Sequence, residues 1–328
     1  MPVPDRLVAI GASAGGVEAL ANFLVQLDAD FVAPIVVVLH VGATASGEFV
    51  RALDRSGPLA VTLAKDGEPL LGGHVYVAPP DHHLLVSGRT CVVAHGPKEN
   101  RSRPAIDPLF RSAAVAYGPG ALGVLLTGYL DDGVAGLGAI LRMGGTAIVQ
   151  DPADADFPDL PRNALARLTV DHVLPVLKMG PVVRRLIAAP MPAEPAHDDT
   201  REGLVAETKI STEAESHVAR EERLGDLAPY ACPECHGPLW KLDDPDVRRF
   251  RCHVGHAYTE TTLADAQADA TERALWAALR SLEERANLLS SMNEDARERG
   301  MGIGGFEERA AQAREHADQL RSLLLQGQ

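Results

Sequence analysis

An apolar run near the start of the sequence breaks abruptly into glycine and small residues, and this break constrains the fold more than any other feature. Residues 7–16 read LVAIGASAGG, and a helix-compatible stretch begins at Val17. This order predicts a strand, a tight turn and a helix N-terminus. Ser13 would then lie at the C-terminal edge of the strand, beside backbone N–H groups that can bind negative charge. Such a position suits either an activated serine nucleophile or a phosphate-binding loop.

The glycines around Ser13 match neither common nucleotide-binding fingerprint. Gly11, Gly15 and Gly16 do not have the spacing G-x-G-x-x-G, and no Gly-Lys-Ser/Thr follows them. The nucleophile interpretation is therefore favoured over the phosphate-binding one. It requires a base and an orienting acid elsewhere in the chain.

Up to about Ala188, apolar β-rich runs alternate with amphipathic stretches. Several of the runs are apolar throughout, as expected for strands covered by helices on both faces. The pattern predicts an α/β domain with a doubly wound, mostly parallel sheet. Residues 61–94 lack a helical pattern, so short strands or a hairpin are expected at the border of the sheet. The predicted strands are 7–10, 35–40, 61–64, 75–78, 122–127 and 146–149, and the predicted helices are 17–27, 47–54, 108–116 and 134–142.

Charge and hydropathy exclude several classes of partner. The formal net charge of −14 argues against nucleic acid and anionic membrane surfaces. The longest apolar run, 31–41, is interrupted by Pro34 and is too short to cross a bilayer. No secretory signal peptide precedes the first strand. We therefore expect a cytoplasmic protein with neither nucleic acid as a partner nor a segment inserted in a membrane.

Two further groups with catalytic chemistry follow predicted strands. His40 ends the run 35–40, and Asp131 and Asp132 follow the run 122–127. Open α/β sheets bind their ligands outside the carboxyl ends of the strands, so these groups are expected at the same edge as Ser13. Each has a plainer alternative, because a lone strand-end histidine is often structural and paired aspartates before a helix are often caps. Together with Ser13 they favour a nucleophile, a base and an orienting acid.

Residues 7–186 resemble the catalytic domain of the CheB-type chemotaxis protein-glutamate methylesterases. The resemblance implies a doubly wound α/β domain that hydrolyses glutamyl methyl esters on a chemoreceptor-like signalling protein and can also deamidate glutamine. The matching segments are IGASAGG (10–16), VLH (38–40), DGEPL (66–70), GHVYVAPPD (73–81), RPAID (103–107), LTGYLDDG (126–133), GT (145–146), VQD (149–151) and DHVLP (171–175).

The resemblance also implies roles for individual residues. Ser13 would be the nucleophile, His40 the general base and Asp132 the acid that orients His40. The backbone near Ala14 and Tyr129 would stabilise the oxyanion. The resemblance implies no cofactor for catalysis.

Asp131 falls on a family position that is not catalytic, and we expect a cap or a surface group there. The sequence departs from the family pattern at three points. Val41, Gly42 and Ala43 follow His40 where the family typically carries Met-Pro. Tyr129 and Leu130 replace the usual Met-Gly, which could narrow the pocket or change the substrate. No receiver domain precedes Leu7, so phosphorylation within this chain would not control the site. A catalytically weak scaffold that binds signalling partners is therefore the alternative to an esterase.

The composition changes after Ala188. Residues 190–200 are rich in proline and polar residues, which indicates a linker. The sequence therefore predicts a methylesterase-like domain at 1–188, a linker at 189–226, and a C-terminal module at 227–328.

Three of the four cysteines cluster in this module. Cys232 and Cys235 have two residues between them, Cys252 follows after sixteen more, and His256 lies four positions beyond Cys252. Three soft ligands and an imidazole within 25 residues predict a structural zinc site, with a short hairpin around 243–246 bringing the two halves together. His253 competes for the fourth position, although its adjacency to Cys252 makes tetrahedral ligation awkward. A set of free thiols is the alternative.

Two apolar stripes with helical spacing end the chain. They predict a packed helical hairpin joined by the glycine-rich turn 300–305, with self-association through these helices as a further possibility. The stripes are 275, 279, 282, 286 and 289, followed by 306, 310, 313, 317, 320 and 324.

Overall fold

The computed structural model describes residues 5–42, 47–192, 198–212, 225–299 and 305–326. These form two compact units, Met1–Leu263 and Ala264–Gln328, and each is considered by itself. No helix among the described residues is long and apolar enough to cross a membrane.

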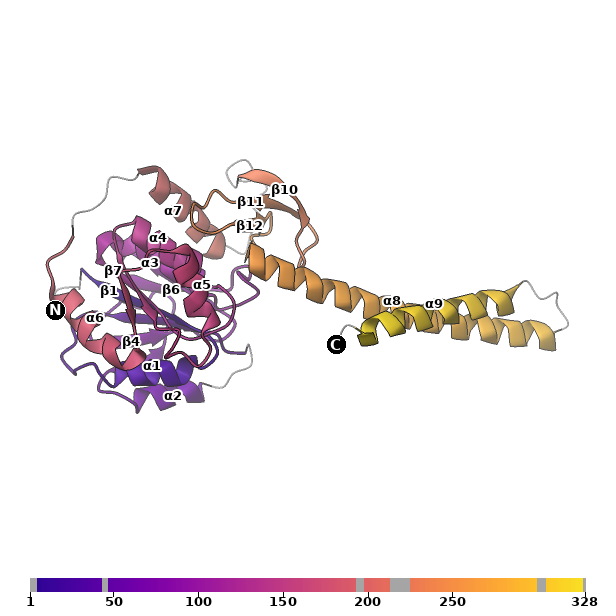
Figure 1. Ribbon diagram of the computed structural model, residues 1–328, viewed down its shortest axis with the longest axis horizontal. Coiled ribbons are helices and arrows are strands. Elements are labelled where there is room, and N and C mark those ends of the chain that lie inside the picture. Colours follow the sequence, from indigo (N-terminus) through magenta and orange to yellow (C-terminus); the bar gives the residue numbers. More distant parts are fainter. Residues whose placement is uncertain (1–4, 43–46, 193–197, 213–224, 300–304, 327–328) are drawn as a thin grey trace. The chain divides into compact units, whose positions relative to one another are not determined.

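A seven-stranded parallel sheet forms the centre of the first unit (Figure 1). The strand order is β3-β4-β2-β1-β7-β8-β9, and every neighbouring pair is parallel. This arrangement confirms the predicted doubly wound sheet. The strands are β1 (Leu7–Ala12), β2 (Ile35–Leu39), β3 (Ala60–Leu63), β4 (His74–Val77), β7 (Ala121–Leu125), β8 (Thr146–Gln150) and β9 (His172–Leu174).

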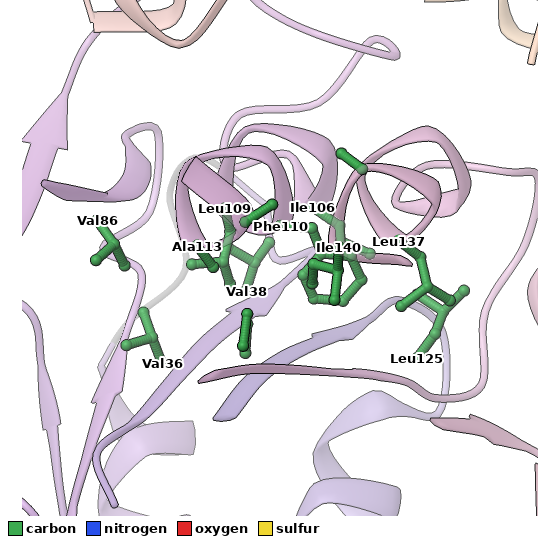
Figure 2. Packing of buried hydrophobic residues seen from close by; sticks show 14 of the residues in the cluster. Val36, Val38, Val86, Ile106, Leu109, Phe110, Ala113, Leu125, Leu137 and Ile140 are labelled. Carbon is green, nitrogen blue, oxygen red and sulfur yellow. The ribbon is translucent and has the colours of Figure 1, made fainter. Parts of the chain in front are cut away.

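Helices cover both faces of this sheet, which explains why its inner strands are apolar throughout. Alternate residues of β2 enter opposite cores: Val36 and Val38 pack on one face, and Val37 packs on the other. Figure 2 shows Val36 and Val38 beneath Leu109 and Phe110 of the helix that covers them. One face carries α3 (Ile106–Tyr117), α4 (Val134–Arg142) and α5 (Asp159–Arg167), and the other carries α1 (Gly16–Leu24), α2 (Glu48–Asp54) and α6 (Met179–Ala188).

The segment 61–94 divides into two parts. Strands β3 and β4 join the parallel sheet as its outermost pair, whereas β5 (His83–Ser87) and β6 (Thr90–Ala94) form the separate antiparallel hairpin. Short 3₁₀ turns at Gly118–Gly120 and Val176–Lys178 complete the connections.

A helix lies within the segment predicted as a linker. Helix α7 (Asp198–Thr212) buries Leu204 and Ile210. Glu207 of the same helix forms ion pairs with Arg111 and Arg249. Two buried apolar residues are too few for an apolar stripe to stand out in the sequence. The domain boundaries at 188 and 226 stay predictions.

The cysteine-bearing segment forms a four-stranded antiparallel sheet, ordered β10-β11-β12-β13. The predicted hairpin around 243–246 is confirmed, because Leu239 of β11 pairs with Cys252 of β12. The strands are β10 (Asp226–Ala231), β11 (Pro238–Lys241), β12 (Arg249–Cys252) and β13 (Ala257–Thr259).

The second unit contains most of α8 (Glu260–Glu298) and all of α9 (Phe306–Gln326). Leu279, Ala317 and Leu324 form its buried cluster, with Leu275 and Leu282 packed against it. The predicted stripes therefore meet within one chain. The turn at 300–304 lies outside the described residues.

Candidate active site

Ser13 lies in the turn between β1 and α1, as predicted. Gly15 has a φ of 73°, a left-handed conformation that favours glycine, and it lets the chain turn into the helix two residues after the serine. Ser13 is only partly buried. Part of the residue is therefore open to solvent at the edge of the sheet.

The loop after β7 lies directly against Ser13. The backbone N–H of Ser13 donates to the carbonyl of Thr127 at 3.0 Å. A Cβ atom on Gly128 would lie 2.7 Å from Cβ of Ser13, so only glycine permits this approach. This contact places Tyr129 beside the serine.

Ser13, His40 and Asp132 meet at the carboxyl edge of the sheet. Nδ1 of His40 lies 3.1 Å from Oγ of Ser13, and Nε2 of His40 lies 2.7 Å from Oδ2 of Asp132. The backbone N–H of His40 donates to the carbonyl of Ala12 at 3.1 Å, which ties the histidine to the strand that carries the serine. With its proton on Nε2 toward the carboxylate, the imidazole presents an unprotonated Nδ1 that can accept the serine proton.

Asp132 is buried with its carboxylate aimed at the N-terminus of α3. Its Oδ2 accepts from the N–H of Ile106 at 2.6 Å, and its Oδ1 accepts from the N–H of Asp107 at 3.3 Å. The side-chain amide of Asn100 donates to Oδ1 at 2.8 Å. These donors fix the orientation of the carboxylate, and the positive end of the α3 helix dipole faces it.

A second carboxyl group, Asp107, lies close to Asp132, and the side-chain amide of Asn100 joins the two. Oδ1 of Asp107 accepts from the N–H of Gly136 at 2.7 Å, and its Oδ2 accepts from the amide of Asn100 at 2.8 Å. Burial and then the negative charge of Asp132 raise the pKa of Asp107 to about 7. Only the fold brings Asp107 and Asn100 next to Asp132, because the sequence separates them by 25 and 32 residues.

Asp131 is neither a surface group nor a side-chain cap, so that expectation was wrong. Its side chain is fully buried, and Oδ1 accepts from the hydroxyl of Thr259 at 2.8 Å. Arg167 lies 3.5 Å from Oδ2. Burial raises the pKa of Asp131. The residue faces the cysteine-bearing sheet, which the sequence could not indicate.

The predicted oxyanion donors flank Ser13 on two sides. Among the described residues, the backbone N–H groups of Ala14 and Tyr129 donate no hydrogen bond, whereas that of Ser13 is used by Thr127. The ring of Tyr129 is 52% exposed and packs edge-on against Phe157, with 4.8 Å between ring centroids. The side chain therefore forms part of the rim of the site.

The four predicted metal ligands also come together. The ligand atoms of Cys232, Cys235, Cys252 and His256 all lie within 4.8 Å of one another. Sγ of Cys235 lies 3.6 Å from Sγ of Cys252, and Sγ of Cys252 lies 3.5 Å from Nδ1 of His256. Tetrahedral zinc with bonds of about 2.0–2.3 Å requires ligand separations of about this size. The ring of His253 lies instead against Gly237.

The comparisons with known proteins agree with this geometry. The family model of the CheB methylesterases matches residues 8–183. A protein of Leptospira interrogans named for protein-glutamate methylesterase and protein-glutamine glutaminase activity is 41% identical over 180 residues, which cover 55% of this chain and 93% of that one. A similarly named protein of Xanthomonas campestris is 42% identical over 189 residues, which cover 56% of this chain and 51% of the relative.

A solved structure shows the same similarity. The CheB methylesterase catalytic domain of Thermotoga maritima matches with a TM-score of 0.54 and 32% identity, over 55% of this chain and 98% of that one. The matched family region ends before the cysteine-bearing sheet and the helical hairpin. Over the region that carries Ser13, His40 and Asp132, the chain belongs to the CheB methylesterase family.

Proposed function

We propose that this protein hydrolyses methyl esters of glutamyl residues on a chemoreceptor-like signalling protein, and that it also deamidates glutamine residues there. The observation that carries the proposal is the continuous hydrogen-bonded line from Ser13 through His40 to Asp132. The names of the relatives supply the substrate class.

The geometry supports a two-step acyl transfer. Oγ of Ser13 attacks the ester carbonyl while Nδ1 of His40 takes the hydroxyl proton. The resulting oxyanion is stabilised by the backbone N–H groups of Ala14 and Tyr129. When the tetrahedral intermediate collapses, His40 returns the proton to the leaving oxygen, and methanol departs. Water then attacks the acyl-enzyme with His40 again as base, which releases the glutamate and restores Ser13.

Release of methanol from a methylated receptor signalling domain tests this proposal. Wild-type protein should release it at a rate at least several orders of magnitude above that of Ser13→Ala. Equal release by both proteins would refute the assignment. An intact protein that binds the receptor domain but releases no methanol would support the alternative of a catalytically weak scaffold.

We also propose that Cys232, Cys235, Cys252 and His256 hold one zinc ion. Three thiolates and one imidazole fill a tetrahedral site, so the ion would stabilise the fold and leave no position open for catalysis. Elemental analysis of the full chain should give about one zinc per chain. Cys252→Ser should lose most of the metal, and His253→Ala should retain it. Loss of the metal in His253→Ala would make His253 the fourth ligand in place of His256.

Self-association through the C-terminal helices also stays a prediction. The buried cluster of these helices is complete within one chain.

A further inference from the structure

Asn100 connects the catalytic acid to a part of the chain outside the family match. Its side chain is 5% exposed, and its φ of 48° is left-handed, a conformation that asparagine and aspartate tolerate better than most residues. The amide nitrogen donates to Oδ1 of Asp132 and to Oδ2 of Asp107, both at 2.8 Å. Both amide hydrogens are therefore committed to the two buried carboxyl groups.

The other side of the same amide faces the end of β13 in the cysteine-bearing sheet and the first turn of α8. Oδ1 of Asn100 accepts from the backbone N–H of Thr259 at 3.0 Å and from the hydroxyl of Thr262 at 3.2 Å. Carboxylates require donors and a backbone N–H requires an acceptor, so these partners fix the orientation of the amide. No side chain with only donors or only acceptors could make all four bonds.

The backbone around Asn100 pairs with β13. The N–H of Asn100 donates to the carbonyl of Ala257 at 2.8 Å, and the N–H of Ala257 donates to the carbonyl of Lys98 at 3.3 Å. Thr259, at the end of β13, also donates its hydroxyl to Asp131, the neighbour of the catalytic acid. Strand β13 thus contacts both segments that surround Asp132.

A buried ionic cluster fixes this contact. Glu99 lies 2.9 Å from Arg111 of α3 and 3.1 Å from Arg251 of β12, and all three side chains are at most 1% exposed. Although burial raises the pKa of Glu99, the two guanidinium groups outweigh it and hold that pKa well below its usual range. Separating the sheet from the domain would leave these charges buried without partners or expose them, so the cluster favours one docked arrangement.

We propose that Asn100 is a positioning residue for Asp132, held in place by the cysteine-bearing sheet. The sheet thereby aligns the carboxylate that orients His40. The proposal rests on the catalytic role given above to Ser13, His40 and Asp132. It extends the active site to Thr259 and Thr262, residues beyond the family match. Since β13 begins directly after His256, metal binding at the four-ligand site would order the strand that holds Asn100.

Asn100→Asp is the sharpest test, because it preserves shape, the left-handed backbone and the acceptor for Thr259. It replaces only the NH₂ group, which donates to Asp132 and Asp107, with an oxygen. We expect kcat to fall about tenfold or more at about pH 8, with KM within about twofold. The loss should grow as pH rises and the new carboxyl group ionises. Asn22→Asp, the same substitution on helix α1, serves as the control.

Two further readouts do not depend on the substrate. The downfield proton resonance of the His40–Asp132 hydrogen bond, assigned by its loss in His40→Ala, should move or broaden in Asn100→Asp. Labelling of Ser13 by a serine-reactive phosphonate should slow by a similar factor as kcat. Neither should change in Asn22→Asp.

Thr262→Val keeps the test decisive if Asn100→Asp does not fold. It removes one donor to Asn100 and one acceptor for the N–H of Thr259, which still donates to Asn100. We therefore expect a loss of about two- to fivefold in labelling rate and a smaller shift of the same resonance. Thr208→Val, which removes a hydroxyl bonded to the backbone of α7, is its control.

The outcomes separate the two proposals. If the resonance and the labelling rate change in these variants but the wild type releases no methanol, the positioning role is supported and the methylesterase proposal is refuted. The opposite result would overturn the positioning role. In it, the wild type releases methanol, but folded Asn100→Asp or Thr262→Val keeps the wild-type resonance, labelling rate and pH profile.

Discussion

Asp132→Asn should remove almost all of the catalytic rate while leaving the fold intact. The wild-type carboxylate accepts from His40, Asn100 and two backbone N–H groups of α3. An asparagine offers one acceptor oxygen and one NH₂ group, so its nitrogen must face a donor. Of these donors only His40 can adapt, because it can move its proton to Nδ1 and accept from the new amide at Nε2; the N–H of Ile106 then loses its acceptor.

That change of tautomer places a proton where the base must accept one. Nδ1 of His40 lies 3.1 Å from Oγ of Ser13, and a protonated Nδ1 cannot take the serine proton. The same replacement of the orienting aspartate in a serine protease triad lowers kcat by about 10⁴-fold, through the same change of tautomer. A loss of this size corresponds to about 5.5 kcal/mol of transition-state stabilisation.

Initial rates of methanol release, with circular dichroism to confirm folding, measure the effect. Asp54→Asn is a matched control, because the Asp54 carboxylate also accepts a backbone N–H but lies at the end of α2. The control should retain wild-type activity. An Asp132→Asn protein within about tenfold of the wild-type rate would refute the assignment of Asp132 as the orienting acid.

Three further predictions follow from the same structure. Burial and Asp132 raise the pKa of Asp107 to about 7, so the folded protein retains a proton that the unfolded chain loses near about pH 4. The free energy of unfolding should therefore fall as pH rises from about 5 to about 8. Urea unfolding should show a drop of about 2–3 kcal/mol that is absent in Asp107→Asn; a parallel profile in both proteins would contradict the shift. The pKa values of Glu99 and Glu207 are lowered instead, so these two groups change the free energy of unfolding only below about pH 4.5 and do not affect this comparison. Cys252→Ser should lower the melting temperature and the zinc content together, and loss of metal at an unchanged melting temperature would contradict a structural role. Tyr129→Ala should change KM while kcat stays within about threefold in steady-state kinetics, because only the backbone N–H of residue 129 acts on the oxyanion. A loss of about 100-fold or more in kcat would show that the side chain itself takes part.

The sequence predicted the sheet because its inner strands are apolar on both faces. Six of the seven strands coincide with predicted ones, and helices on both faces explain why the inner ones are apolar runs. The exception, β9, has three residues at the edge of the sheet, none of them buried. Helix α6 escaped prediction because its first turn contains Gly180 and Pro181, which read as a break although proline is tolerated there.

The site was predictable to the extent that its residues follow strands. Ser13 and His40 lie at strand ends, and Asp132 lies beyond another, so a parallel sheet brings them to one edge. Asn100 and Asp107 belong to a loop and a helix start that no periodicity relates to Asp132. The burial of Asp131 depends on Thr259, 128 residues away, and no local pattern reports such a contact.

Methanol release from a methylated receptor signalling domain, measured for wild type and Ser13→Ala side by side, tests the central claim most directly. The geometry predicts rapid release by the wild type and a rate near background for the variant, with both proteins equally folded. Equal rates in the two proteins would contradict the account.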